Sequence, residues 1–218
     1  MTKDMQKLES FMRQKTYQTW LKDQSKCFSL LVHGMSTPTS LVSALSYLCA
    51  QIAEEHANDN KIIIISYFCG LRVLDGDASA VDMLCQLIGQ LLSQKAIARL
   101  YARDPVERNL RKKIKARDLK TLLGVFSSII KRLRQCALEI FCLIDSITKI
   151  ERVELRKDTE IVLKHLSELV REQKRRKGMI DDRMVFKLLV TDEARSLVAY
   201  RFFDTRETIN LVVGSYLG

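Results

Sequence analysis

The sequence has few of the residues that interrupt regular structure: eight glycines and two prolines in 218 residues. Such a composition disfavours a linker-rich, fibrous or low-complexity chain. No apolar run approaches the roughly 20 residues that a membrane-spanning helix needs, and the polar amino terminus lacks the apolar segment of a signal peptide. We therefore expect a single globular domain over residues 1–218, located in the cytoplasm, with the nucleus as the alternative.

Metal-binding patterns are also scarce. The three histidines lie far apart, and the six cysteines form no Cys-x-x-Cys pair, so we expect no metal site. Most of the cysteines fall within apolar segments, where a free thiol behaves as a small buried hydrophobic side chain. They are Cys27, Cys49, Cys69, Cys85, Cys136 and Cys142.

The chain carries a formal net charge of +10, concentrated in two basic segments, 99–120 and 171–177. Such segments attract nucleic acid or an anionic membrane surface, but they are also typical of a solvated connector and of a helix carboxyl end. Both interpretations stay open, and the scarcity of aromatic residues disfavours base stacking. The residues assigned to this basic patch are Arg111, Lys112, Lys113, Lys115, Arg175, Arg176 and Lys177.

The hydrophobic pattern alternates between short, nearly continuous apolar runs and longer segments with helical spacing. Such alternation predicts an α/β fold in three layers, with a mostly parallel sheet of about five strands between helices. We expect a helical lead-in over 1–24, an α/β core over 25–203 and a C-terminal helix over 204–218. The expected strands are 27–32, 61–68, 140–145 and 185–191.

Several local details follow from the same pattern. Asp77 and Asp158 precede apolar stripes and are expected to cap helices. Residues 196–203 fit either a fifth strand or a turn-rich end of the sheet, and Thr205 is expected to begin the C-terminal helix. Ligands in such folds bind beyond the carboxyl ends of the strands, so the segments after each strand are the places to seek chemistry.

Six motifs, in order, closely resemble the nucleotide-binding core of NACHT proteins, and in particular fungal members of the STAND class of P-loop NTPases. The resemblance extends over about residues 17–217. The motifs include Phe-Ser-Leu-Leu-Val-His-Gly ending at Gly34, Phe-Cys-Leu-Ile-Asp ending at Asp145, and Phe-Lys-Leu-Leu-Val-Thr ending at Thr191. The resemblance implies a P-loop NTPase-like fold and a site for ATP or GTP with Mg²⁺.

The phosphate-binding loop that the resemblance implies is degenerate. Its pattern, Gly-x-x-x-x-Gly-Lys-Ser/Thr, cradles phosphates on backbone amides and supplies a cation from the lysine. Here Gly34 is retained, but Thr39 stands for the second glycine, Ser40 for the lysine and Leu41 for the magnesium-binding hydroxyl. A register shifted by one residue keeps Ser40 as the hydroxyl and still supplies no cation.

The other two motifs are degenerate as well. Asp145 stands where the resemblance implies a magnesium ligand, but Thr148 and Lys149 replace the acidic pair that would orient the attacking water. The resemblance also implies Thr-Ser-Arg after the next strand.

That strand instead ends with Thr191, followed by Asp192 and Glu193, with Arg195 two residues further on. Glu193 therefore occupies the position where a cation would sense the nucleotide.

These losses predict a catalytically inactive NACHT-like module that acts in protein interaction or regulation, with a protein partner or a second copy of the chain, and with no cofactor. One alternative is a STAND domain that binds ATP or GTP with Mg²⁺ and hydrolyses it weakly or not at all. A second alternative is a domain that binds nucleic acid or an anionic surface through the basic segments 99–120 and 171–177.

Overall fold

Five parallel strands form the centre of the molecule in the computed structural model, which describes residues 3–34, 42–74, 78–95, 97–98, 106–176 and 183–211. The strand order is β2-β3-β4-β1-β5. All positions of β3 and β4 are buried, as expected for strands covered on both faces. The strands are β1 (Phe28–His33), β2 (Ile62–Phe68), β3 (Glu139–Asp145), β4 (Val185–Asp192) and β5 (Thr208–Asn210).

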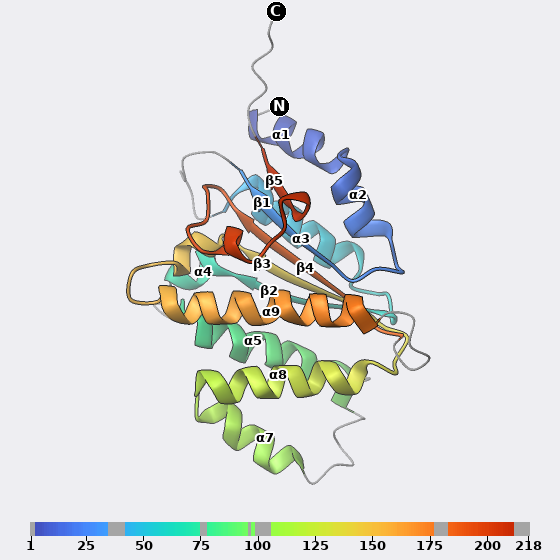
Figure 1. The fold of residues 1–218 in the computed structure, drawn as a ribbon, viewed down its shortest axis with the longest axis vertical. Helices are drawn as coiled ribbons and strands as arrows, with labels where there is room; N and C mark the ends of the chain where they lie inside the picture. Colours follow the sequence, from blue (N-terminus) through green and yellow to red (C-terminus); the bar gives the residue numbers. More distant parts are fainter. Residues whose placement is uncertain are drawn as a thin grey trace, which may run out of the picture.

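Helices cover both faces of this sheet, which confirms the expected three-layer α/β architecture (Figure 1). One face packs against α1 (Lys3–Met12), α2 (Lys15–Lys22) and α3 (Ala44–Glu55). The other packs against α5 (Ala80–Ser93), α8 (Leu119–Leu133) and α9 (Arg156–Arg176). The short helix α4 (Cys69–Leu74) follows β2 directly, and α7 (Val106–Lys115) lies outside α8 (Figure 1).

Alternate residues of the central strands β3 and β4 pack on opposite faces of the sheet. Phe141 and Leu143 of β3, with Leu189 of β4, belong to the core beneath α1, α2 and α3. Cys142 and Leu188 belong to the core beneath α5, α8 and α9. The polar residues at the ends of these strands therefore share a face with the apolar residues two positions away.

A lysine is fully buried within this sheet. Lys187, in β4, donates a hydrogen bond to the carbonyl oxygen of Leu21 at 3.0 Å and forms an ion pair with Glu139. Its ammonium also lies 4.9 Å from the centre of the Phe141 ring. Because Leu21 lies in the last turn of α2, the lysine joins the helical lead-in to the sheet.

The carboxyl-terminal part of the chain differs from the prediction. Thr205–Glu207 forms a 3₁₀ turn, η3, and the next three residues form β5, which pairs in parallel with β1. The helix expected over 204–218 is therefore wrong for residues 205–210, because the open edge of β1 offers hydrogen-bond partners to an extended segment. Residues 212–218 lie outside the described residues. Within 196–203, the structure has turns and the 3₁₀ helix η2 (Ala199–Arg201) rather than a strand.

Two predicted helix caps are also wrong. Ser79, not Asp77, caps α5, and its side chain accepts a hydrogen bond from the amide of Asp82. Asp158 lies within the first turn of α9, which begins at Arg156. An acidic residue is still stabilising at that position, because the amino end of a helix carries partial positive charge.

No helix among the described residues has both the length and the apolar composition that crossing a membrane requires.

Candidate functional site

A buried carboxylate lies at the carboxyl edge of the sheet, where the sequence predicted the site. Asp145, the last residue of β3, accepts hydrogen bonds from three hydroxyl groups. Thr191 Oγ1 donates to one carboxylate oxygen at 2.7 Å, and Ser46 Oγ donates to the other, also at 2.7 Å. Ser146 Oγ donates to that second oxygen at 3.0 Å. Asp145 and Thr191, two of the predicted site residues, are thus in direct contact.

Helix α3 supplies Ser46 through its amino-terminal cap. The side chain of Ser43 accepts a hydrogen bond from the Ser46 amide, while the Ser43 amide donates to Ser46 Oγ, both at 3.0 Å. This reciprocal capping box fixes the first turn of α3 and leaves the Ser46 hydroxyl proton for Asp145. Sequence reasoning placed the hydroxyl at residues 40 or 41 and missed Ser46, although the Ser-x-x-Ser spacing was a visible cap signal.

The turn after β3 brings the third hydroxyl. Ser146 has φ 57°, in the left-handed region that a residue with a side chain seldom adopts. This conformation ends the strand and begins the 3₁₀ helix η1 (Ile147–Ile150), and the Ser146 hydroxyl bonds to its neighbour Asp145. The strained turn is therefore compensated by a buried hydrogen bond.

The environment of Asp145 disfavours its charge. Burial raises the pKa of Asp145 above its ordinary value, although the three hydroxyl donors act in the opposite direction. Both carboxylate oxygens already accept hydrogen bonds, and no cation takes part in the described contacts. The described contacts of Asp145 do not fit direct binding of a magnesium ion, and no group of three His, Cys, Asp or Glu side chains among the described residues could hold a metal ion.

A second carboxylate occupies the next strand end. Asp192, the last residue of β4, accepts hydrogen bonds from the amides of Thr148, at 2.6 Å, and Ala194, at 2.8 Å. Burial raises the pKa of Asp192. Thr148, which stands where the resemblance implied an acidic residue, is thus part of a bridge between η1 and the loop after β4.

A third carboxylate extends this polar network. Glu151 accepts hydrogen bonds from the Ser196 hydroxyl and, at 2.7 Å, from the Leu197 amide. Asp145, Glu151 and Asp192 are all nearly inaccessible to solvent. Sequence reasoning missed Glu151 and did not assign Asp192 to the site, because nothing near them in the sequence indicates burial.

Gly34 serves a close approach between two chain segments. Its amide donates to the carbonyl oxygen of Asp192 at 2.7 Å, and a β-carbon placed on Gly34 would lie 3.0 Å from the carbonyl oxygen of Glu193. Backbone contact with the loop after β4 therefore accounts for the glycine. Thr39, Ser40 and Leu41 lie outside the described residues.

The cations predicted near the site do not take part in the contacts of Asp145. Arg195 is exposed, and its guanidinium lies 5.7 Å from the centre of the Tyr200 ring. Lys149 is part of η1 and is half-buried. The described residues at this edge, Asp145 and Asp192 at two strand ends and Glu151 after η1, therefore provide three buried carboxylates, and none of these has a hydrogen-bonding cation in the described contacts.

The predicted basic patch divides between two helices. Arg111, Lys112, Lys113 and Lys115 lie on α7, whereas Arg175 and Arg176 lie in the last turn of α9. Lys177 lies outside the described residues. Of the α7 group, Lys113 lines a groove between α7 and α8.

The three-layer fold and the position of the polar strand ends define an α/β domain of the P-loop NTPase-like type. The family model described as Nephrocystin 3, N-terminal, matches residues 6–191. The match covers most of the chain, so the chain belongs to this family. The family match neither names the NACHT proteins nor indicates a fungal origin.

Among solved structures, a chain from a structure of Drosophila ORC bound to DNA aligns with a TM-score of 0.45 and 11% identity, over 95% of this chain and 89% of that one. No curated protein sequence matches the chain.

Proposed function

We propose that this chain is a catalytically inactive, NACHT-like P-loop NTPase-like module of a STAND or NLR-like protein, and that it acts in protein interaction or regulation. The observation that carries the proposal is the burial and hydrogen bonding of the Asp145 carboxylate. A magnesium-handling aspartate needs an accessible, ionised carboxylate, whereas both oxygens of Asp145 are buried and bonded to hydroxyl groups.

The groups that would perform hydrolysis support the same proposal. Phosphoryl transfer depends on positioning and on stabilising the negative charge of the transition state. At the corresponding strand ends, the Thr148 amide is bonded to Asp192 and Glu193 stands where a cation is implied. A negative charge at Glu193, where a cation is implied, repels a triphosphate rather than stabilising it.

Exposed apolar side chains near this edge favour a role in interaction. Leu197 and Tyr200 are 55% and 44% exposed, and the guanidinium groups of Arg195 and Arg201 lie within 6 Å of the Tyr200 ring centre. Tyrosine and arginine are enriched in protein interfaces. The partner is a different protein or a second copy of this chain.

The decisive experiment is calorimetric titration with ATP and with GTP, each with Mg²⁺, together with a phosphate-release assay. We expect no heat of micromolar binding and no release above the buffer rate. Asp145→Asn is the matched variant, because it removes the charge and keeps the shape. Micromolar binding that Asp145→Asn weakens would favour the nucleotide-binding alternative and would contradict the proposal.

A further inference from the structure

Most of the excess positive charge lies on α7 and α8. Residues 110–134 contain nine basic residues and one acidic residue, in a chain with net charge +10. Arg117 pairs with Asp82, and Arg134 pairs with Glu172. Among the described residues, Lys112, Lys113, Lys115 and Lys120 take part in no ion pair. Charge concentrated in this way attracts a polyanion.

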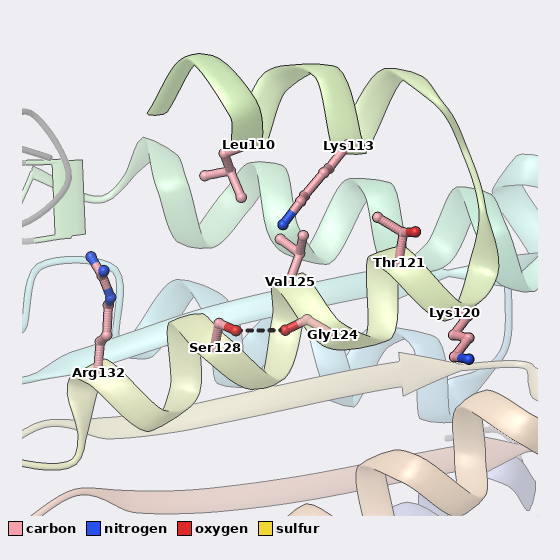
Figure 2. A pocket seen from close by; sticks show the side chains of 8 residues that line it. All are labelled: Leu110, Lys113, Lys120, Thr121, Gly124, Val125, Ser128 and Arg132. Atoms are coloured by element: carbon pink, nitrogen blue, oxygen red, sulfur yellow. Dashed lines mark hydrogen bonds between the residues drawn. The ribbon is translucent and has the colours of Figure 1, made fainter. Parts of the chain in front are cut away.

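A groove of about 530 Å³ lies between the two helices. Figure 2 shows the Lys113 side chain reaching from α7 toward Val125 of α8, inside the groove. Arg132 lies at one end of the groove and Lys120 at the other. Twelve residues separate these two cations along α8, which corresponds to about 18 Å of helix.

The middle of the groove is open because the α8 side chains there are small. Gly124 and Ser128 lie between Lys120 and Arg132 at four-residue spacing, on one side of the helix. A β-carbon on Gly124 would meet nothing within 4 Å, so packing does not require the glycine. Glycine within a helix costs about 1 kcal/mol relative to alanine. The residue that leaves the groove open is therefore unfavourable for the helix itself.

We propose that this groove binds the phosphate backbone of a nucleic-acid duplex without reading its sequence. The cations distributed along the groove suit successive phosphates, which provide most of the sequence-independent affinity for DNA. No large hydrophobic side chain is exposed on the described part of α7 or on α8, so the surface offers neither a stacking platform for single strands nor an anchor in a bilayer.

The first test asks whether duplex binding depends on the positive charge of the groove. Fluorescence anisotropy with a labelled 20-base-pair duplex of mixed sequence should show binding at about 50 mM salt that weakens steeply by about 200 mM. The double variant Lys113→Ala with Lys120→Ala should lower the slope of log affinity against log salt by about 1 to 2. The control is Lys61→Ala with Lys164→Ala, which removes the same charge from exposed positions outside α7 and α8.

The second test changes the shape of the groove and leaves its charge unaltered. Gly124→Gln should fill the groove and weaken duplex binding several-fold, with thermal unfolding at or above the wild-type temperature. Gly89→Gln is the matched control, because Gly89 is also helical and its β-carbon would also meet nothing within 4 Å. It should leave duplex binding unchanged.

Several outcomes would overturn the proposal. They are absence of duplex binding at low salt, equal effects of the two lysine pairs, and wild-type binding by Gly124→Gln. Tighter binding to a single-stranded 20-mer, or binding to phosphatidylserine vesicles without binding to the duplex, would also overturn it. None of these outcomes bears on the loss of nucleotide hydrolysis, which has its own test.

Discussion

One face of the sheet buries an ionisable side chain near each end of its strands, Lys187 at one end and Asp145 at the other. The two side chains have different kinds of partner. Toward the amino ends of the strands, Lys187 has an anionic partner, Glu139, a carbonyl acceptor and an aromatic ring. Toward the carboxyl ends, the described donors to Asp145 are neutral: three hydroxyl groups and the backbone amide of Ser146. Leu143 and Leu189 lie between them on the same face.

The two charged groups differ in what the loss of a partner would leave behind. A buried ion pair is costly to break, because the partner left behind is an uncompensated charge. A carboxylate held by hydroxyl groups can become neutral and keep much of its hydrogen bonding. The buried cation thus joins α2 to the sheet, while no cation takes part in the described contacts of Asp145 at the other end.

The largest expected effect comes from Lys187. Lys187→Ala should lower the free energy of unfolding by about 3–5 kcal/mol, because Glu139 loses its partner and the α2 carbonyl loses its donor. Urea denaturation measures this loss. Lys164→Ala, an exposed control, should change stability by less than about 0.5 kcal/mol. A loss below about 1 kcal/mol in Lys187→Ala would show that the pair contributes little.

Substitutions of Asp145 should lower the free energy of unfolding by less than Lys187→Ala does. The loss should depend on which residue replaces the aspartate. Asp145→Ala should cost about 1–3 kcal/mol, because three buried hydroxyl groups lose their acceptor. Asp145→Asn retains an acceptor and should stay within about 1 kcal/mol of the wild type near neutral pH. Chemical denaturation of both variants tests this order, and equal losses would indicate that the charge itself is needed.

A smaller effect is expected at the helix cap. Ser46→Ala should cost about 1 kcal/mol, since it removes one donor to Asp145 and half of the capping box. Ser128→Ala is the control, because the Ser128 hydroxyl is exposed and bonds only to its own helix at Gly124. Thermal unfolding of the two variants should show a lower midpoint for Ser46→Ala alone.

The smallest effect concerns pH. Because burial raises the pKa of Asp145, the folded chain holds this proton more tightly than the unfolded chain does. The stability of the wild type relative to Asp145→Asn should therefore fall as pH rises from about 4 through the folded pKa, and then stay constant. Urea denaturation of both proteins from about pH 4 to pH 8 measures the difference. A difference that grows in favour of the wild type would contradict the assigned direction.

The sequence was sufficient for the parallel sheet and for the proximity of Asp145 and Thr191 at one edge of it. Nearly continuous apolar runs over β3 and β4 can be buried only between two layers of helices, which restricts the architecture strongly. Because parallel strands end at a common edge, Asp145 and Thr191 were expected near each other, and they are hydrogen-bonded.

Other features had no readable local signal. Lys187 lies in a largely apolar strand, and only its contacts with distant residues, Leu21 of α2, Glu139 and Phe141, explain how a lysine can be fully buried. Strand β5 is three residues long, too short for a periodicity to show. It forms because the edge of β1 is available to it.

The amino-acid order by itself determined which segments are apolar and where strands β3 and β4 end, because these are properties of neighbouring residues. Tertiary structure alone decided that Ser46 meets Asp145 across 99 positions, that Asp192 bridges η1 and the loop after β4, and that Lys187 joins α2 to the sheet. Burial and hydrogen-bond partners depend on which distant segments pack together, and that packing sets both the charge and the accessibility of each group.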